Sequence, residues 1–206
     1  MANYSKKQKI ALDAMMKEEV YKCALNLLTD SDTGALSLEM LAAEIGVSRA
    51  TLYNYFKDRD AILEFVEERT FSPVLEKLRV IADANDTPTE KLQAFIGETI
   101  RSEAELGKIL IAVSREHQVG RRRLTGEANE NGGRAPEYTN ILANLIKEGI
   151  ESGELADQPI TLVTDLIVGM LRAVTMRMVT SNQVLNPEEV VPVVLQTVFQ
   201  GLRKTA

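Results

Sequence analysis

Apolar residues recur at helical spacing along almost the whole chain, and no run shows the strict alternation that marks a strand. The stretch from Ser5 to Thr29 contains neither Gly nor Pro, so it predicts one long helix. The same periodicity predicts further helices over residues 38–45, 49–55, 59 onward, 88–119, 138–152, 161–180 and 187–204. The pattern therefore predicts an all-α fold.

Polar residues and prolines indicate where these helices begin or are disturbed. Residues 87–90 read Thr-Pro-Thr-Glu, the signature of a capping box with proline at the first helical position. Asp58 and Asn186 predict two further N-caps. Proline cannot donate a backbone hydrogen bond, so we expect a kink or a restart at Pro73 and a bend at Pro192.

Residues 37–55 carry the most specific pattern in the chain. Ser37 is a good N-cap for a short amphipathic helix, and Gly46 ends it because glycine takes the left-handed conformation without strain. Ser48 caps a second short helix, expected roughly over 49–55. Two short helices joined by a tight turn form a helix-turn-helix, whose second helix fits the major groove of DNA.

The longer run from Leu41 to Leu63, L-A-x-x-I-G-V-S-x-x-T-L-Y-x-Y-F-K-x-R-x-x-I-L, resembles the DNA-binding signature of the TetR family of transcriptional regulators. This resemblance implies a three-helix DNA-binding head over residues 1–65. It also implies a helical bundle over residues 66–206 that binds an effector and dimerises. A homodimeric repressor of a palindromic operator is then expected, although activation is an open alternative. The alternative interpretation of the motif is that the two short helices pack as core helices and do not bind DNA.

Side chains that project from the second short helix are suited to base edges and phosphates. Arg49, Tyr53, Asn54 and Tyr55 project on the expected helix, whereas Leu52 faces inward. The resemblance places Arg49 and Tyr55 at base contacts and Thr51, Lys57 and Arg59 at phosphates, with Tyr53 mixed. The complete set of candidate DNA-binding residues is Ser48, Arg49, Ala50, Thr51, Tyr53, Asn54, Tyr55, Lys57 and Arg59.

The helix predicted over residues 161–180 is apolar on two faces, which indicates burial on both sides. A membrane span of this length is argued against by Asp165, Arg172 and Arg177 within it. We therefore expect this helix and its successor to pair with their copies in a four-helix dimer interface. The candidate interface residues are Leu162, Leu166, Gly169, Ala173, Val191, Leu195, Val198 and Leu202.

Apolar residues between 92 and 178 predict a pocket for a small, largely hydrophobic effector. Arg115, His117 and Arg177 are possible orienting groups, although most of the apolar members could equally be ordinary core residues. The candidate pocket residues are Phe95, Ile109, Val113, His117, Tyr138, Leu142, Met170, Met176 and Arg177.

The charge balance at first argues against a nucleic-acid partner. The 206-residue chain has a net charge of −6, and residues 1–65 carry eight Lys or Arg against ten Asp or Glu. Any positive patch must therefore be local, from Arg49, Lys57 and Arg59, with Lys6, Lys7 and Lys9 as possible contacts to neighbouring phosphates. The acidic residues elsewhere would help to reject non-specific DNA.

Candidate chemistry for an enzyme is sparse. His117 is the sole histidine and Cys23 the sole cysteine, and no glycine-rich phosphate loop is present. We expect no catalytic residues, no metal and no cofactor, a buried Cys23, and a location in the reducing cytoplasm. The second hypothesis is a helical carrier or interaction module for hydrophobic ligands with a degenerate head. The effector, the operator, the Ser5–Met16 extension and the Arg121–Arg123 run are left unassigned.

Overall fold

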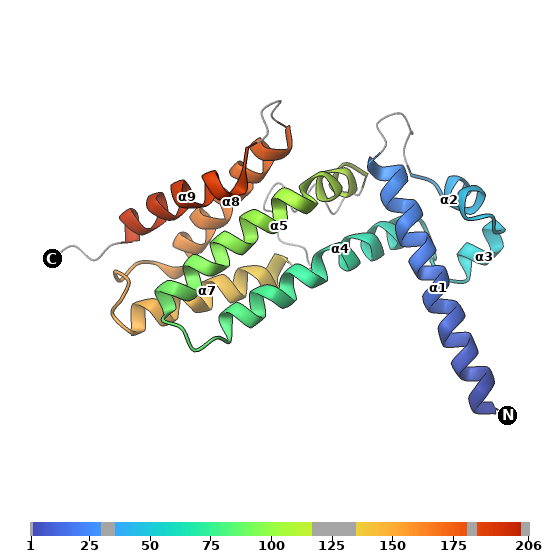
Figure 1. Cartoon of the computed structure of the whole chain (residues 1–206), viewed down its shortest axis with the longest axis horizontal. Coiled ribbons are helices and arrows are strands. Elements are labelled where there is room, and N and C mark those ends of the chain that lie inside the picture. The colour runs from blue at the N-terminus through green and yellow to red at the C-terminus, as the bar shows by residue number, and fades with distance from the viewer. Residues whose placement is uncertain (1, 30–35, 117–134, 181–184, 203–206) are drawn as a thin grey trace. The chain divides into compact units, whose positions relative to one another are not determined.

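The computed structural model describes residues 2–29, 36–116, 135–180 and 185–202, and all regular structure in these segments is helical (Figure 1). The prediction of an all-α fold is confirmed. The helices are α1 (Ala2–Thr29), α2 (Leu38–Ile45), α3 (Arg49–Tyr53), α4 (Arg59–Ala82), α5 (Pro88–Glu116), α7 (Ala135–Glu151), α8 (Ile160–Thr180) and α9 (Pro187–Leu202).

The predicted helix caps are present. The Asp58 carboxylate accepts the backbone N–H of Ala61 at 2.8 Å at the start of α4. At the start of α5, the Thr87 hydroxyl accepts the N–H of Glu90 at 3.3 Å, and the Glu90 carboxylate accepts the N–H of Thr87 at 3.0 Å. Asn186 caps α9 by the same type of bond, at 3.1 Å. These local interactions fix the helix boundaries from residues close in sequence.

Both internal prolines lie within continuous helices. Helix α4 runs through Pro73 without a restart, and α9 runs through Pro192. Proline removes one backbone hydrogen bond, but Leu75 and Leu78 on the following turns of α4 are buried. Tertiary packing therefore maintains the helix across the missing bond.

The chain divides into two compact units. One contains Met1–Thr70 together with Ile109–Arg121, and the other contains Phe71–Lys108 together with Arg122–Ala206. Helices α4 and α5 thus each contribute to both units. The sequence predicted a boundary at 65/66 between two contiguous domains. It did not predict that the described residues 109–116 of α5 group with the N-terminal unit.

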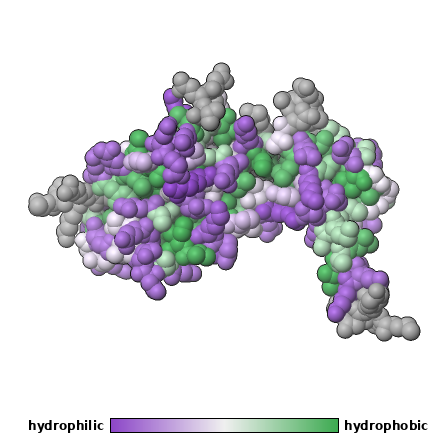
Figure 2. Space-filling model, viewed as in Figure 1, coloured by the Kyte–Doolittle hydropathy of each residue, from purple (hydrophilic) through white to green (hydrophobic). Residues whose placement is uncertain are grey.

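The core of the first unit is formed by α1, α2, α3 and the first part of α4, together with Val113 and Ile109 from the end of α5. Leu41 of α2, Leu52 of α3 and Ile62 of α4 are fully buried against Val20 of α1. These contacts position α2 and α3 on α1 and α4 and leave one side of α3 exposed. In the N-terminal half of α1, three large apolar side chains are more than half exposed: Ile10, Leu12 and Met15. Figure 2 shows apolar surface on this part of the molecule.

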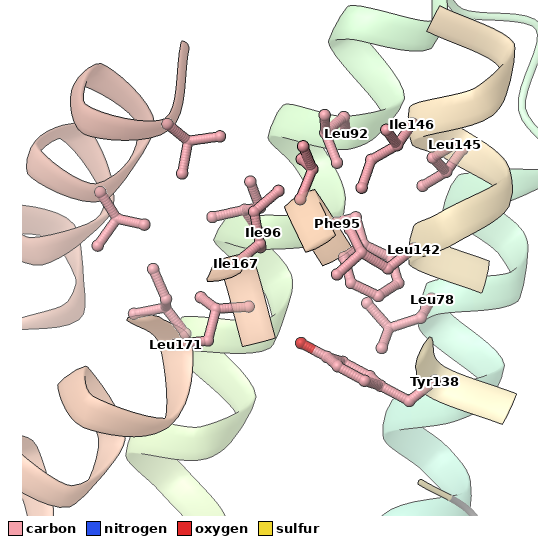
Figure 3. Close-up of a cluster of buried hydrophobic side chains, with 14 of the residues drawn as sticks. Leu78, Leu92, Phe95, Ile96, Tyr138, Leu142, Leu145, Ile146, Ile167 and Leu171 are labelled. Carbon is pink, nitrogen blue, oxygen red and sulfur yellow. The ribbon is translucent and has the colours of Figure 1, made fainter. Parts of the chain in front are cut away.

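The core of the second unit is a larger apolar cluster contributed by α4, α5, α7, α8 and α9 (Figure 3). Phe95 of α5 and Tyr138 of α7 pack with ring centroids 5.1 Å apart and ring planes tilted by 42°, and Leu142 and Ile146 of α7 belong to the same cluster. Helices α5 and α8 approach closely at Gly107, where an added Cβ would lie 2.5 Å from a Val179 methyl group. The absence of a side chain at Gly107 permits this approach.

Candidate nucleic-acid interface and effector core

Helix α2 and the turn after it have the geometry expected from their sequence. The Ser37 hydroxyl accepts the backbone N–H of Met40 at 3.2 Å. Gly46 has a φ of 77°, and its N–H donates to the Ala42 carbonyl at 3.0 Å. A side chain at Gly46 would be strained at this φ, so glycine permits the tight turn into α3.

Helix α3 is capped at its start and is shorter than predicted. The Ser48 hydroxyl accepts the N–H of Thr51 at 3.1 Å. The helix ends at Tyr53, and the N–H groups of Tyr55 and Phe56 both donate to the Leu52 carbonyl at 2.9 Å. Leu52 and Phe56 are buried, so the chain tightens to bring both side chains into the core. The predicted end at Tyr55 was therefore two residues too late.

The candidate DNA-binding residues differ in how accessible they are. Ser48, Arg49, Ala50, Tyr53, Asn54 and Lys57 are exposed, whereas Thr51, Tyr55 and Arg59 are half-buried. Leu52 and Phe56, in the same stretch, are buried instead. This arrangement leaves donors, acceptors and aromatic rings available to an external partner.

Arg49 is paired with a carboxylate of the preceding helix. Its Nη2 lies 2.8 Å from the Glu39 Oε1, and both side chains are largely exposed. An exposed pair of this kind contributes about 0–1 kcal/mol, so a stronger partner can replace it. The sequence pattern for α2 gave no indication of this pairing, because Glu39 reads as an ordinary first-turn acidic residue.

Tyr55 is held by the extended part of α1. Its hydroxyl donates to the Asp13 carboxylate at 3.0 Å, and this hydrogen bond raises the pKa of Tyr55. Asp13 therefore joins the N-terminal extension to the segment after α3. The sequence left the role of residues 5–16 open, with Lys6, Lys7 and Lys9 as possible phosphate contacts, and it did not indicate this hydrogen bond from Asp13.

The two basic residues beyond α3 have different environments. The Lys57 side chain is 78 % exposed, with its ammonium 3.9 Å from Asp58. Arg59 instead donates from Nε to the Leu36 carbonyl at 2.6 Å, which ties the start of α4 to the segment before α2. Lys57 is thus available to an anion, whereas Arg59 has a structural contact within the head.

The candidate pocket residues do not form one group. Phe95, Tyr138 and Leu142 are buried together in the second unit, and Met170 is partly buried beside them. Val113 and Ile109 pack in the core of the first unit instead. The helical pattern of α5 could not predict this separation, because it identifies an apolar face but not the helix that packs against it. The remaining candidates are Met176 and Arg177, which are exposed, and His117, which lies outside the described residues.

The candidate interface residues also separate into two kinds. An exposed apolar stripe on α8 contains Leu162, Leu166, Gly169 and Ala173, and the two leucines are 56 % and 62 % exposed. Val191 and Val198 of α9 are instead buried in the protomer's own cluster. Leu195 is partly buried, and the side chain of Leu202 lies outside the described residues. Val193, not among the candidates, is an exposed apolar residue of α9.

A polar group absent from the sequence-based candidates lies between α5 and α8. The Thr175 hydroxyl of α8 hydrogen-bonds the Glu103 carboxyl of α5. Burial raises the pKa of Glu103 to about 7, opposed by the Thr175 bond and the nearby Arg172. Burial also raises the pKa of Tyr138, whose hydroxyl hydrogen-bonds Thr99. Glu103 was missed because a single acidic residue in an amphipathic helix normally indicates the solvated face.

Two sequence models cover most of the chain. The model of bacterial regulatory proteins of the tetR family matches residues 21–66, which span the capped α2–α3 pair. A tetracyclin repressor-like C-terminal domain matches residues 85–176. The chain belongs to the TetR family. It is a TetR-family transcriptional regulator with a helix-turn-helix DNA-binding head, which confirms the resemblance seen in the sequence.

Relatives of this TetR-family chain include regulators of fatty acid metabolism. It is 23 % identical over 154 residues to the fatty acid metabolism regulator protein of Bacillus subtilis, covering 74 % of this chain and 78 % of that protein. The structure of FadR from B. subtilis in complex with stearoyl-CoA has a TM-score of 0.74 at 20 % identity, over 90 % of this chain and 99 % of that one. A TetR/AcrR-family regulator from Thermobifida fusca has a TM-score of 0.67 at 25 % identity, over 92 % and 99 %.

The relatives named above are regulators and not enzymes. Cys23 is buried, as expected, and burial together with Glu44 and Glu19 raises the pKa of its thiol. The described residues contain no cluster of three or more His, Cys, Asp or Glu side chains placed to bind a metal ion. Of the helices described, none combines the length and hydropathy needed to cross a membrane.

Proposed function

We propose that this protein is a homodimeric repressor that releases a palindromic operator when a long-chain acyl thioester binds in its C-terminal unit. DNA binding is supported mainly by the capped α2–α3 helix pair. Leu52 is buried in the core while Arg49, Tyr53 and Asn54 remain exposed. A carrier with a degenerate head would not require such a surface.

Arg49 and Tyr55 are proposed to contact bases, and Lys57 a phosphate. Arginine can bond guanine O6 and N7 together, whereas the lysine ammonium acts as a point charge. Thr51 and Arg59 are weaker candidates for phosphate contacts, since Arg59 already donates to the Leu36 carbonyl. In a dimer the two copies of α3 would lie about 34–36 Å apart and require a palindromic site.

The exposed apolar stripe on α8 supports dimerisation. Leu162, Leu166, Gly169 and Ala173 recur at helical spacing, and nothing lies within 4 Å of the position of a Cβ on Gly169. Such a stripe on a two-fold axis can pack against its own copy. We propose this face of α8, with the exposed part of α9, as the centre of the dimer interface.

The effector class is supported by the apolar cluster of the second unit and by the relatives. The cluster around Phe95, Leu142 and Met170 can line a hydrophobic chain. FadR from B. subtilis, whose fold is similar to that of this chain, was solved in complex with stearoyl-CoA. An acyl thioester with a long chain is therefore the effector that we propose.

A mobility-shift experiment tests this function. The protein is titrated against the DNA upstream of its own gene, in the presence of stearoyl-CoA, free CoA or neither. We expect a discrete complex that stearoyl-CoA dissociates and free CoA does not. A protein that binds stearoyl-CoA but no DNA would be the helical carrier instead. A reporter assay, in which deletion of the gene raises expression, distinguishes repression from activation.

A further inference from the structure

Glu103 is an acidic residue in an otherwise apolar part of the second unit. It lies on α5 one turn before Gly107, where α5 and α8 approach closely. The Thr175 hydroxyl of α8 is its hydrogen-bond partner. Placing an ionised carboxylate in such surroundings costs free energy, so a carboxyl group kept there indicates a role other than stability.

The hydrogen bonds around Thr175 indicate which form of Glu103 this site favours. The Thr175 oxygen lies 2.9 Å from the Leu171 carbonyl and also contacts Glu103. A hydroxyl has one hydrogen, so it cannot donate fully to two acceptors at once. If Glu103 is protonated, its own O–H donates to Thr175, and Thr175 donates to Leu171. The Thr175 oxygen and the Leu171 carbonyl then each accept one full hydrogen bond.

Three groups surround Glu103 on the packed helices. Thr175 and Arg172 come from α8, and Tyr138 comes from α7. The Arg172 charge favours the ionised form of Glu103, whereas burial opposes it and has the larger effect, so that the pKa rises to about 7. At neutral pH the two forms are therefore balanced, and a bound ligand can shift the population.

The apolar cluster is covered more completely around Phe95 than around Glu103. Leu92, Phe95 and Leu145 are 0–1 % exposed. On the turns flanking Glu103 and Thr175, Leu106 of α5 and Val174 of α8 are only partly buried, as are Glu103 and Thr175 themselves. A few polar groups within an incompletely covered apolar lining are typical of a ligand site.

We propose that protonated Glu103 is the polar anchor of the effector site. In the free protein its O–H donates to Thr175. On binding, this O–H turns to the carbonyl oxygen of an acyl thioester whose chain lies against the apolar residues of α5 and α8, while Thr175 keeps its bond to the Leu171 carbonyl. This inference rests on the proposed function and names the atom of the ligand that is recognised. A neutral carbonyl suits the site because it accepts a hydrogen bond from the Glu103 O–H without adding a negative charge.

Binding of stearoyl-CoA, measured by calorimetry below its micelle concentration, tests the proposal. With a pKa of about 7, the protonated fraction falls about tenfold between pH 6 and pH 8, so the Kd of the wild type should rise about tenfold. Glu103→Gln keeps a neutral donor and should lose this dependence. Glu105→Gln, an exposed site on the same helix, is the matched control and should retain it.

A second ligand tests whether the carbonyl oxygen is the atom recognised. S-octadecyl-CoA is the thioether analogue that lacks this oxygen. It should bind the wild type about five- to tenfold more weakly than stearoyl-CoA at pH 6, and Glu103→Ala should remove the difference between the two ligands. Because the CoA moiety is identical in both, its own ionisation cancels in this comparison.

The outcomes separate this inference from the proposed function. If stearoyl-CoA dissociates the operator complex but binds with the same pH dependence in wild type and Glu103→Gln, the anchor role is wrong and the regulator stands. An equal affinity for the two CoA ligands in the wild type also overturns the anchor. If stearoyl-CoA does not bind at all, the proposed effector class fails together with the anchor.

Discussion

The guanidinium of Arg49 at the start of α3 lies 2.8 Å from the carboxylate of Glu39 in α2. The residue best suited to bind guanine is therefore already neutralised within the head. On non-specific DNA, Arg49 gains little by leaving Glu39 for a phosphate. At the proposed operator, two hydrogen bonds to one guanine can replace the pair.

Glu39→Gln should therefore weaken discrimination between operator and random DNA. We expect affinity for random DNA to rise about two- to fivefold, with a salt dependence steeper by up to about one unit, and operator affinity to change less. Fluorescence anisotropy with both DNAs over a salt series measures this. Glu44→Gln, on the same helix, is the control. Equal effects of the two variants would show that only net charge matters.

Arg49→Ala and Lys57→Ala should separate base reading from phosphate binding. Arg49→Ala should cost roughly 1–3 kcal/mol and relax the preference at one base pair per half-site. Lys57→Ala should weaken all sequences alike and reduce the salt slope by about one unit per site. Binding-site selection with both variants in parallel is the measurement. A changed consensus for Lys57→Ala, with Arg49→Ala unchanged, would reverse the two roles.

Ala173→Arg should prevent dimerisation by placing a charge in the exposed stripe of α8. We expect a monomer by light scattering and a loss of operator binding, since one half-site contributes too little affinity alone. Thr161→Arg adds the same charge to the same helix, about 100° away from the stripe, and should remain dimeric. A dimer in both variants would remove this face of α8 from the interface.

Glu103→Gln should change how stability depends on pH. The pKa of Glu103 is about 7 in the folded protein, against an ordinary value of 4.5 for the solvated carboxyl of the unfolded chain. Between pH 4.5 and pH 7 the folded state therefore binds more protons than the unfolded state. This carboxyl's contribution is therefore fully present below about pH 4.5 and is lost as pH rises through 7. Relative to wild type, the variant should be more stable by about 1–2 kcal/mol at pH 8, measured by urea unfolding. An unchanged difference between pH 5 and pH 8 would contradict this.

Gly107→Ala should destabilise the second unit. The added methyl group would lie 2.5 Å from a Val179 methyl, and overpacking of this kind typically costs about 1–3 kcal/mol. Gly97→Ala in the same helix should be neutral or stabilising by up to about 1 kcal/mol, because the nearest atom is the movable end of Arg101. Thermal unfolding of both variants is the measurement, and Gly107→Ala combined with Val179→Ala should recover part of the loss.

Features that depend on neighbouring residues were predictable from the sequence. The caps at Ser37, Asp58 and Thr87 involve residues three apart, and the turn at Gly46 needs only one backbone conformation. The family motif from Leu41 to Leu63 added the function of the head. Because these signals are local, one sequence was sufficient to read them.

Features that depend on distant residues were not predictable in the same way. Periodicity showed that Phe95 and Val113 share an apolar helix, but not that the two pack in different units. Likewise, Val191 and Val198 read as a free face of α9 and are buried in the protomer. Burial raises the pKa of Glu103, and this burial is not visible in the sequence of α5 alone; Thr175 and Arg172, which oppose it, lie about seventy residues further along the chain.

The bond between Tyr55 and Asp13 has a thermodynamic consequence for the proposed base contact. The phenolic hydroxyl donates to a carboxylate before DNA arrives, at 3.0 Å. To bond a base, it must exchange one acceptor for another, so the number of its hydrogen bonds does not increase. With the correct base, the exchange changes the binding free energy little. With a wrong base, the hydroxyl loses a partner, and binding is weakened. A head built on such exchanges gains sequence selectivity with little binding enthalpy, and its affinity depends mainly on counterion release at phosphates.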